Sequence, residues 1–129
     1  MIGYSMIGTN DIDRSRRFYE ALVKILGGDE LRDISTDRQS WFRGLSRSST
    51  PFAIVKTYDG APAAPGNGNM LALVAMTRDL VDAAYAKALE LGAKDEGAPG
   101  IRGSVARGFY AAYFRDPDGN KLCVYRTGP

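Results

Sequence analysis

The sequence contains no histidine among its 129 residues. This excludes a Ser-His-Asp or Cys-His catalytic arrangement and any metal site built on imidazole nitrogens. Only one cysteine, Cys123, is present, which excludes an internal disulfide framework and is compatible with a reducing cytosol. No apolar run approaches the ~20 residues of a membrane-spanning helix, and the first residues lack the pattern of a signal peptide. We therefore expect a cytoplasmic protein without a membrane partner.

The sequence also lacks an excess of charge of either sign. Seventeen Lys and Arg residues oppose fifteen Asp and Glu, giving a net charge of +2. The densest basic group, Arg14, Arg16 and Arg17, has the spacing of a solvated helix face. No aromatic side chains are interleaved with basic ones in the way that nucleic-acid-binding motifs show, so we expect no nucleic-acid partner.

The clearest positive signal is the turn Asp116-Pro117-Asp118-Gly119, which separates two strand-like runs, 110–114 and 121–125. Proline presets the φ angle that the turn needs, and glycine adopts the positive φ that closes a hairpin. The stretch therefore predicts a β-hairpin near the end of the chain.

The first half of the chain shows one helix and four strand-like runs. Thr9-Asn10-Asp11 offers capping side chains, after which apolar residues recur at helical spacing until Gly27-Gly28. A glycine- and proline-rich loop at 59–68 follows this half. The strands are expected at 2–8, 31–34, 40–44 and 52–58.

The second half repeats this pattern. Thr77 follows Thr9 by 68 residues, and Asp95 follows Asp29 by 66, each in a similar local context. A strand is expected at 70–76, then a helix ending at Gly92, then a glycine-rich loop at 97–108 before the hairpin. The repetition indicates an internal duplication of a β-α-β-β-β unit. One α+β domain, 1–129, is expected, with module one at about 1–60 and module two at about 68–129.

The hairpin sequence Arg-Asp-Pro-Asp-Gly-Asn-Lys-Leu, residues 115–122, resembles the last hairpin of the vicinal oxygen chelate (VOC) superfamily. That superfamily includes glyoxalase I, bleomycin-resistance proteins and extradiol dioxygenases. Residues 10–15, followed by Phe18-Tyr19, also resemble its first helix start. The resemblance implies the glyoxalase/bleomycin resistance fold, in which two β-α-β-β-β modules form a cupped mixed sheet, and it implies a homodimer.

Metal-using members of the superfamily carry ligands, usually His or Gln and Glu, on the first and last strand of each module. The resemblance places these positions at Tyr4, Met70 and Cys123, with the fourth at either Ile54 or Lys56. These side chains do not supply the carboxylates and imidazoles that bind a divalent cation in such enzymes. We therefore expect no metal and no other cofactor.

Strand alternation sorts the side chains onto two faces. We expect one face to lie beneath the helices and the other to form an apolar, aromatic-lined pocket for a small molecule. The alternative is that the second face packs a closed core or a dimer seam. The expected ligand-binding residues are Tyr4, Met6, Trp41, Ile54, Lys56, Tyr58, Met70, Cys123 and Tyr125, and Phe52 is expected on the same face.

Three of these residues are candidates for catalysis. Lys56 is expected either to bind an anion and act as an electrophile in place of a metal, or simply to reach into solvent from a strand end. Tyr4 would donate hydrogen bonds or satisfy a backbone carbonyl. Cys123 would act as a nucleophile only if its thiolate were stabilised. Arg102 and Arg107, in the glycine-rich loop, either close over an anionic ligand or are solvated.

The sequence thus favours a metal-independent, small-molecule-binding protein of the glyoxalase/bleomycin-resistance type. The alternative is a divergent lyase or isomerase resembling glyoxalase I, or a thiol transferase, that uses Lys56, Tyr4 or Cys123. A third hypothesis is a structural or interaction subunit without a ligand. The sequence does not identify the ligand.

Overall fold

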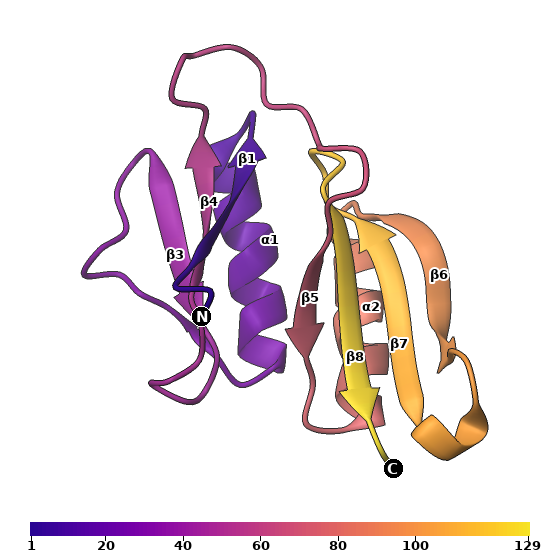
Figure 1. Ribbon diagram of the computed structural model, residues 1–129. Helices are drawn as coiled ribbons and strands as arrows, with labels where there is room; N and C mark the ends of the chain where they lie inside the picture. The colour runs from indigo at the N-terminus through magenta and orange to yellow at the C-terminus, as the bar shows by residue number, and fades with distance from the viewer. The chain divides into compact units, whose positions relative to one another are not determined.

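A computed structural model describes all residues, 1–129, and shows two compact units, Met1–Pro65 and Gly66–Pro129 (Figure 1). Each unit contains one α-helix and one four-stranded sheet, in the chain order β-α-β-β-β. The predicted α+β fold of two modules is therefore confirmed. No helix has both the length and the apolar character that crossing a membrane requires.

The first unit is built from β1 (Ser5–Thr9), α1 (Ile12–Ile25), β2 (Asp29–Glu30), β3 (Gln39–Arg43) and β4 (Phe52–Lys56). Its strands lie in the order β1-β4-β3-β2. Strand β1 runs parallel to β4, and the other pairs are antiparallel. The parallel pair requires a long crossover connection, part of which is α1.

The second unit repeats this arrangement with β5 (Leu71–Val74), α2 (Arg78–Glu90), β6 (Lys94–Ile101), β7 (Phe109–Arg115) and β8 (Lys121–Thr127). A short 3₁₀ helix, η1 (Val105–Arg107), precedes β7. The strand order is β5-β8-β7-β6, and β5 is parallel to β8. The two sheets therefore have the same topology.

Both helices begin at the expected capping residues. The side chain of Asp11 accepts a hydrogen bond from the Arg14 amide (3.0 Å) at the start of α1. The hydroxyl of Thr77 accepts one from the Leu80 amide (3.2 Å) at the start of α2. Such caps satisfy backbone donors that a helix leaves unpaired in its first turn.

The core of the first unit is aromatic. Helix α1 buries Phe18, Tyr19 and Leu22, which recur on one face at helical spacing. The Tyr19 ring lies 5.6 Å from that of Phe52 and 6.2 Å from that of Phe42, while the two phenylalanine rings stack at 5.5 Å. This face of the sheet is thus closed by α1.

The core of the second unit uses smaller helix residues. Helix α2 buries Val81, Ala84 and Ala88 and contacts β7 and β8. On those strands Phe114 and Leu122, paired across the sheet, are fully buried. The second sheet therefore also has one face covered by a helix.

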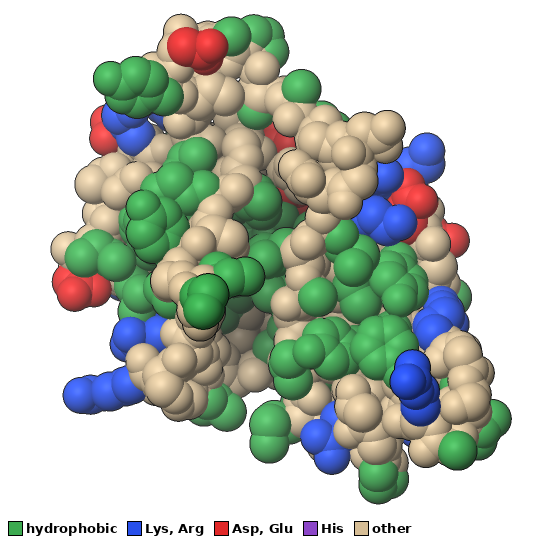
Figure 2. Space-filling view, viewed as in Figure 1, with side chains coloured by type: hydrophobic (Ala, Val, Ile, Leu, Met, Phe, Trp, Pro, Cys, Tyr) green, Lys and Arg blue, Asp and Glu red, His purple; other side chains and the backbone are tan.

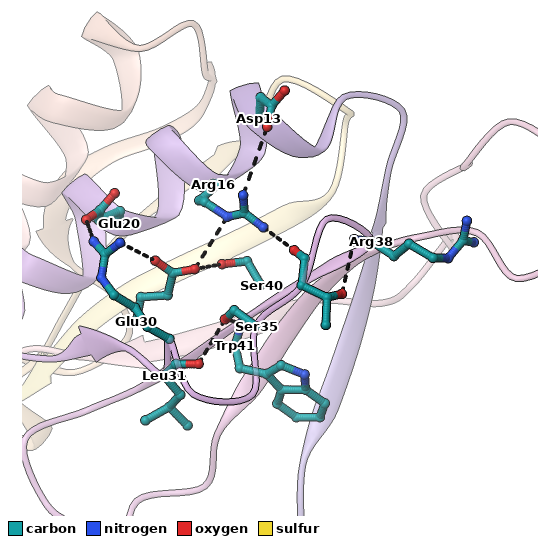
Figure 3. Close-up of polar contacts among 11 residues, drawn as sticks. Asp13, Arg16, Glu20, Glu30, Leu31, Ser35, Arg38, Ser40 and Trp41 are labelled. Atoms are coloured by element: carbon teal, nitrogen blue, oxygen red, sulfur yellow. Dashed lines mark hydrogen bonds and ion pairs between the residues drawn. The ribbon is translucent and has the colours of Figure 1, made fainter.

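A polar cluster joins α1 to β2 and β3 in the first unit (Figure 3). The side chain of Glu30 is only 4% exposed. Its Oε1 accepts a hydrogen bond from the Ser40 hydroxyl at 2.6 Å and lies 3.4 Å from Nε of Arg16. Its Oε2 lies 3.7 Å from Arg32, which also pairs with Glu20 at 2.7 Å. The buried carboxylate is thus compensated by one hydroxyl and two guanidinium groups.

Two local predictions are wrong. Residues 31–34 form a turn rather than a strand, because the amides of Ile34 and Ser35 both donate to the Leu31 carbonyl. The predicted loop at 97–108 begins as a strand, since β6 continues to Ile101 and pairs with β7 across two register shifts. Glycine permits such bulges without ending the strand pairing.

The predicted C-terminal hairpin is confirmed. The buried Asp116 side chain accepts hydrogen bonds from the amides of Asp118 and Asn120, both at 2.9 Å. Gly119 has a φ of 90°, as the turn requires. The turn fixes the register of β7 against β8, pairing Arg115 with Lys121.

Candidate ligand-binding site

Each sheet has a second face that carries no helix of its own unit, which we call the open face. Cross-strand partners point to the same face of a sheet, so the register identifies its members. In the first unit these include Met6 and Trp41, both paired with Ala53. In the second they include Ala72 and Tyr113, both paired with Cys123. Figure 2 shows hydrophobic side chains gathered over the strands of both units.

The open face of the first unit brings together three of the predicted ligand-binding residues. Tyr4, just before β1, is 60% exposed, and Met6 is 46% exposed. The Tyr4 ring meets the half-buried Trp41 ring edge-on, with centroids 5.4 Å apart. Figure 3 shows Trp41 pointing away from the polar cluster around Glu30. The result is an exposed aromatic surface with one methionine beside it.

The prediction that Ile54 and Lys56 share this face is wrong. Ile54 pairs with Ile7 and is 1% exposed, within the core that α1 covers. Lys56 pairs with Thr9, whose hydroxyl lies 2.7 Å from that of Ser15 on α1. Lys56 is therefore an exposed residue at the end of β4, on the side of the sheet that carries the helix.

Phe52 and Tyr58 also lie elsewhere than predicted. Phe52 is buried in the aromatic core beneath α1. Strand β4 ends at Lys56, so Tyr58 lies in the following turn and is fully exposed. Neither residue contributes to the open face.

The open face of the second unit carries the remaining predicted residues. Met70 directly precedes β5 and is 48% exposed. Tyr125 pairs with Val74, which is 58% exposed, and its ring lies 5.2 Å from that of Phe109. Cys123 shares this face but is only 1% exposed. One end of the face is thus apolar and accessible, and its cysteine is covered.

Tyr113 is the cross-strand partner of Cys123 and lies beside its thiol on this face. Burial raises the pKa of the Cys123 thiol, and this outweighs the opposing effects of Tyr113 and of the positive charges on Arg102 and Lys121. Burial also raises the pKa of Tyr113. The thiol therefore stays protonated at neutral pH, which is unfavourable for a nucleophile.

We expect Cys123 to react with iodoacetamide at about pH 8 at least ~100-fold more slowly in the folded than in the unfolded protein. The raised pKa lowers the thiolate fraction, and burial of the thiol restricts access of the reagent. Removing the neighbouring ring in Tyr113→Ala should speed labelling by about tenfold. The rates are measured by mass spectrometry. Equal rates for the folded and unfolded protein would show that the thiol is accessible.

Tyr113, Phe109 and Lys121 also lie on this face, although the sequence analysis did not identify them as site residues. A signal for all three was present in the hairpin. Counting outward from the Asp-Pro-Asp-Gly turn pairs residue 115 with 121 and hence residue 113 with 123. Because side chains alternate along a strand, the same count places 109 and 121 on the face of Cys123.

Comparison with known proteins agrees with this architecture. The model of the Glyoxalase/Bleomycin resistance protein/Dioxygenase superfamily matches residues 1–124. The chain belongs to this superfamily. The resemblance of the hairpin at 115–122 is thereby confirmed.

Three solved structures illustrate the relationship. A glyoxalase/bleomycin resistance protein from Albidiferax ferrireducens T118 is 33% identical, with 95% of each chain covered and a TM-score of 0.83. A glyoxalase/bleomycin resistance protein/dioxygenase family enzyme from Burkholderia phytofirmans PsJN is 20% identical, with 96% of each chain covered and a TM-score of 0.72. A fosfomycin resistance protein from Mesorhizobium loti is 19% identical, covering 100% of this chain and 92% of its own, with a TM-score of 0.68. No curated protein matches the sequence closely enough to count as a relative.

The strand register indicates which residue stands at the fourth ligand position that the family resemblance implies. Cys123 pairs with Ala72 in the second unit as Ala53 pairs with Met6 in the first. The equivalent of Cys123 is therefore Ala53, rather than Ile54 or Lys56. The alanine side chain has no atom that can coordinate a metal ion.

The residues present do not fit a divalent metal ion. The four positions hold Tyr4, Ala53, Met70 and Cys123, which together offer no carboxylate and no imidazole. No group of three or more His, Cys, Asp or Glu side chains is placed to hold an ion. We therefore derive no chemistry at the open faces through a bound metal.

Proposed function

We propose that the protein binds a small apolar or aromatic molecule on its open faces, without a divalent metal. The observation that carries this proposal is the exposure of large apolar side chains on both sheets where no helix of the unit covers them. Tyr4, Met6, Met70 and Val74 are each between 46% and 60% exposed. Exposed apolar surface gathered in this way is typical of a binding site.

The chemistry of the two faces suits flat, weakly polar ligands. The rings of Trp41 and Tyr4 lie side by side at an interplanar angle of 73°, and aromatic contacts between such rings and a planar ligand add to the gain from burial. Met6 and Met70 adapt to irregular shapes because their side chains are unbranched and polarisable. Burial of ligand surface contributes about 25 cal/mol per Å². The apolar surfaces of the two faces would therefore select a ligand mainly by its shape.

The names of two similar structures support the proposal that the protein binds a small molecule. Resistance to bleomycin and to fosfomycin, named for two of the similar structures, concerns small molecules. The catalytic alternatives receive less support, because Cys123 is buried as a protonated thiol and Lys56 lies on the helix-covered side of its sheet. Binding is therefore the function that the site supports best.

We further propose that the protein is a homodimer of the cytosol. Strands β1 and β5 are edge strands in their sheets, and edge strands of this kind readily pair with other chains. The single free thiol suits a reducing compartment. Sedimentation of the purified protein tests the dimer, and a monomer at high concentration would contradict it.

The neutral fluorescent probe phenylnaphthylamine tests the proposed function. We expect saturable binding with a dissociation constant of about 1–100 μM, typical of an unoptimised apolar ligand. Trp41 is the only tryptophan, so binding near it should quench its emission directly. The same probe should raise the thermal stability of the protein increasingly as its concentration rises above the dissociation constant.

Divalent metals serve as the control. Because the four positions lack suitable donors, zinc, nickel or manganese should neither shift the melting temperature nor increase probe affinity. A metal-dependent gain in affinity would contradict a metal-independent site. Failure of the probe and of other aromatic ligands to bind would favour a structural or interaction subunit.

A further inference from the structure

The open face of the second unit has a cationic end. The guanidinium of Arg102 crosses over the glycines of β6, where a Cβ atom on Gly100 would lie 3.0 Å from its Nη1 and one on Gly97 would lie 3.2 Å from its Nη2. The guanidinium carbon lies 5.6 Å from the centre of the Tyr113 ring. The two glycines leave room for the Arg102 guanidinium, which lies against the sheet beside the Tyr113 ring.

A second cation lies on the same ring. Nζ of Lys121 lies 5.8 Å from the Tyr113 ring centre. The register places Lys121 two residues from Cys123 on β8, and so on the same face. Arg102, Lys121 and Tyr113 are all half-buried, which strengthens the electrostatic effect of the two charges.

Neither Arg102 nor Lys121 forms an ion pair with a carboxylate. One N–H of Arg102 donates to the Ala98 carbonyl, and its remaining donors have no protein acceptor. The nearby carboxylate of Glu96 is bound to Arg115 at 2.9 Å. That carboxylate has its pKa lowered, first by Arg115 and then by Lys121 and Lys94. Three cationic groups, on Arg115, Lys121 and Lys94, therefore act on the Glu96 carboxylate, and Arg102 adds a further positive charge to this face.

We propose that Arg102 and Lys121, whose cationic groups lie 5.6 and 5.8 Å from the Tyr113 ring centre, bind the anionic group of the ligand. This inference rests on the proposed function and narrows its ligand to an apolar or aromatic molecule that carries a carboxylate, sulfonate or phosphate. Guanidinium and ammonium groups together satisfy the oxygens of such an anion through charge-assisted hydrogen bonds.

The rest of the face accommodates the apolar part of the ligand. Strand β8 places Tyr125 two residues beyond Cys123, the partner of Tyr113, and four beyond Lys121, which are distances of about 7 and about 13 Å along the strand. Tyr125 contacts Phe109 and pairs with the exposed Val74. The cationic end and the apolar end thus lie within the length of one aromatic molecule, which fixes the orientation in which it binds.

A matched pair of fluorescent probes tests the inference. Anilinonaphthalene sulfonate and phenylnaphthylamine share the same aromatic body, but only the first carries an anion. We expect Arg102→Gln and Lys121→Gln each to weaken binding of the sulfonate by about tenfold. Binding of the neutral probe should change by less than about twofold. Added salt should weaken only the sulfonate complex.

Three further variants distinguish the effect of where the Arg102 guanidinium lies from the effect of the overall positive charge. Gly100→Ala keeps every charge but displaces the Arg102 guanidinium, so it should weaken sulfonate binding by several-fold, about as much as a lost hydrogen bond. Arg107→Gln removes an exposed cation from η1, and Lys56→Met removes one from the helix-covered side of the first sheet. Both controls should leave the affinity of either probe unchanged.

The outcomes distinguish this inference from the proposal on which it rests. If the neutral probe binds but the sulfonate is insensitive to Arg102→Gln and Lys121→Gln, the anion site is wrong and the apolar site stands. Equal weakening of both probes, or equal weakening by the two control cations, would also overturn it. If neither probe binds, the proposed function fails and the anion site with it.

Discussion

Phe42→Ala is expected to lower the free energy of unfolding by about 4 kcal/mol, the cost typical of deleting a buried phenylalanine. Trp41→Ala, at the neighbouring position of β3, is expected to lower it by only about 1 kcal/mol. The same two substitutions should affect ligand binding in the opposite order. Trp41→Ala should weaken phenylnaphthylamine by about tenfold, because aromatic anchors dominate such contacts.

The reason is the alternation of side chains along β3. Phe42 is fully buried between the rings of Tyr19 and Phe52, so its removal leaves a cavity that the stacked rings cannot fill. Trp41 points to the open face, where its principal ring contact is with Tyr4. The larger side chain thus contributes less to folding.

Urea unfolding followed by circular dichroism measures the two stabilities, and probe fluorescence measures the affinities. Phe42→Leu is a matched control, because it retains most of the buried volume and should cost about 1–2 kcal/mol. A loss of stability in Trp41→Ala equal to that in Phe42→Ala would contradict the assignment of the two faces. Normal affinity in Trp41→Ala would remove Trp41 from the ligand site.

Glu30→Ala is expected to lower the free energy of unfolding by about 3 kcal/mol, although it removes a charged residue from a two-residue strand. The Glu30 carboxylate is nearly inaccessible, and the fully buried Ser40 hydroxyl donates to it. In the variant that hydroxyl loses its acceptor inside the protein. Arg16, whose side chain is 27% exposed, loses its buried partner as well.

Two matched variants identify the source of this effect. Glu20→Ala removes the partner of the same Arg32, but both side chains are exposed there, at 43% and 74%, so the loss should stay below about 1 kcal/mol. Glu30→Gln keeps an oxygen acceptor for Ser40 and should recover roughly half of the loss in Glu30→Ala. Chemical denaturation compares the three. Similar stabilities for Glu20→Ala and Glu30→Ala would show that burial of the carboxylate contributes nothing.

Sequence patterns predicted the elements that carry strong local signals. Asp11 and Thr77 cap the two helices because their side chains accept backbone hydrogen bonds, a property readable from residue type and position. The Asp116–Gly119 turn was recognisable for the same reason. In each case the structure is determined by neighbours within a few residues.

The errors lie where the outcome depends on partners far along the chain. Residues 52–55 read Phe-Ala-Ile-Val, apolar on both faces, so the sequence gives no sign of which face meets α1. An error of one residue in register moves every side chain to the other side, and this misplaced Ile54 and Lys56. The glycines of β6 suggested a loop, but pairing with β7 holds them in a strand. The burial of Cys123 beside Tyr113 likewise follows from cross-strand pairing.

The separation of roles along β3 has an evolutionary consequence. A mutation at position 41 alters what the open face presents, while the neighbouring Phe42 continues to hold the sheet to α1. Natural selection can therefore change the surface of the open face by single substitutions that leave the fold intact. Such a scaffold tolerates extensive sequence divergence, as the similar folds at 33% and 20% identity illustrate.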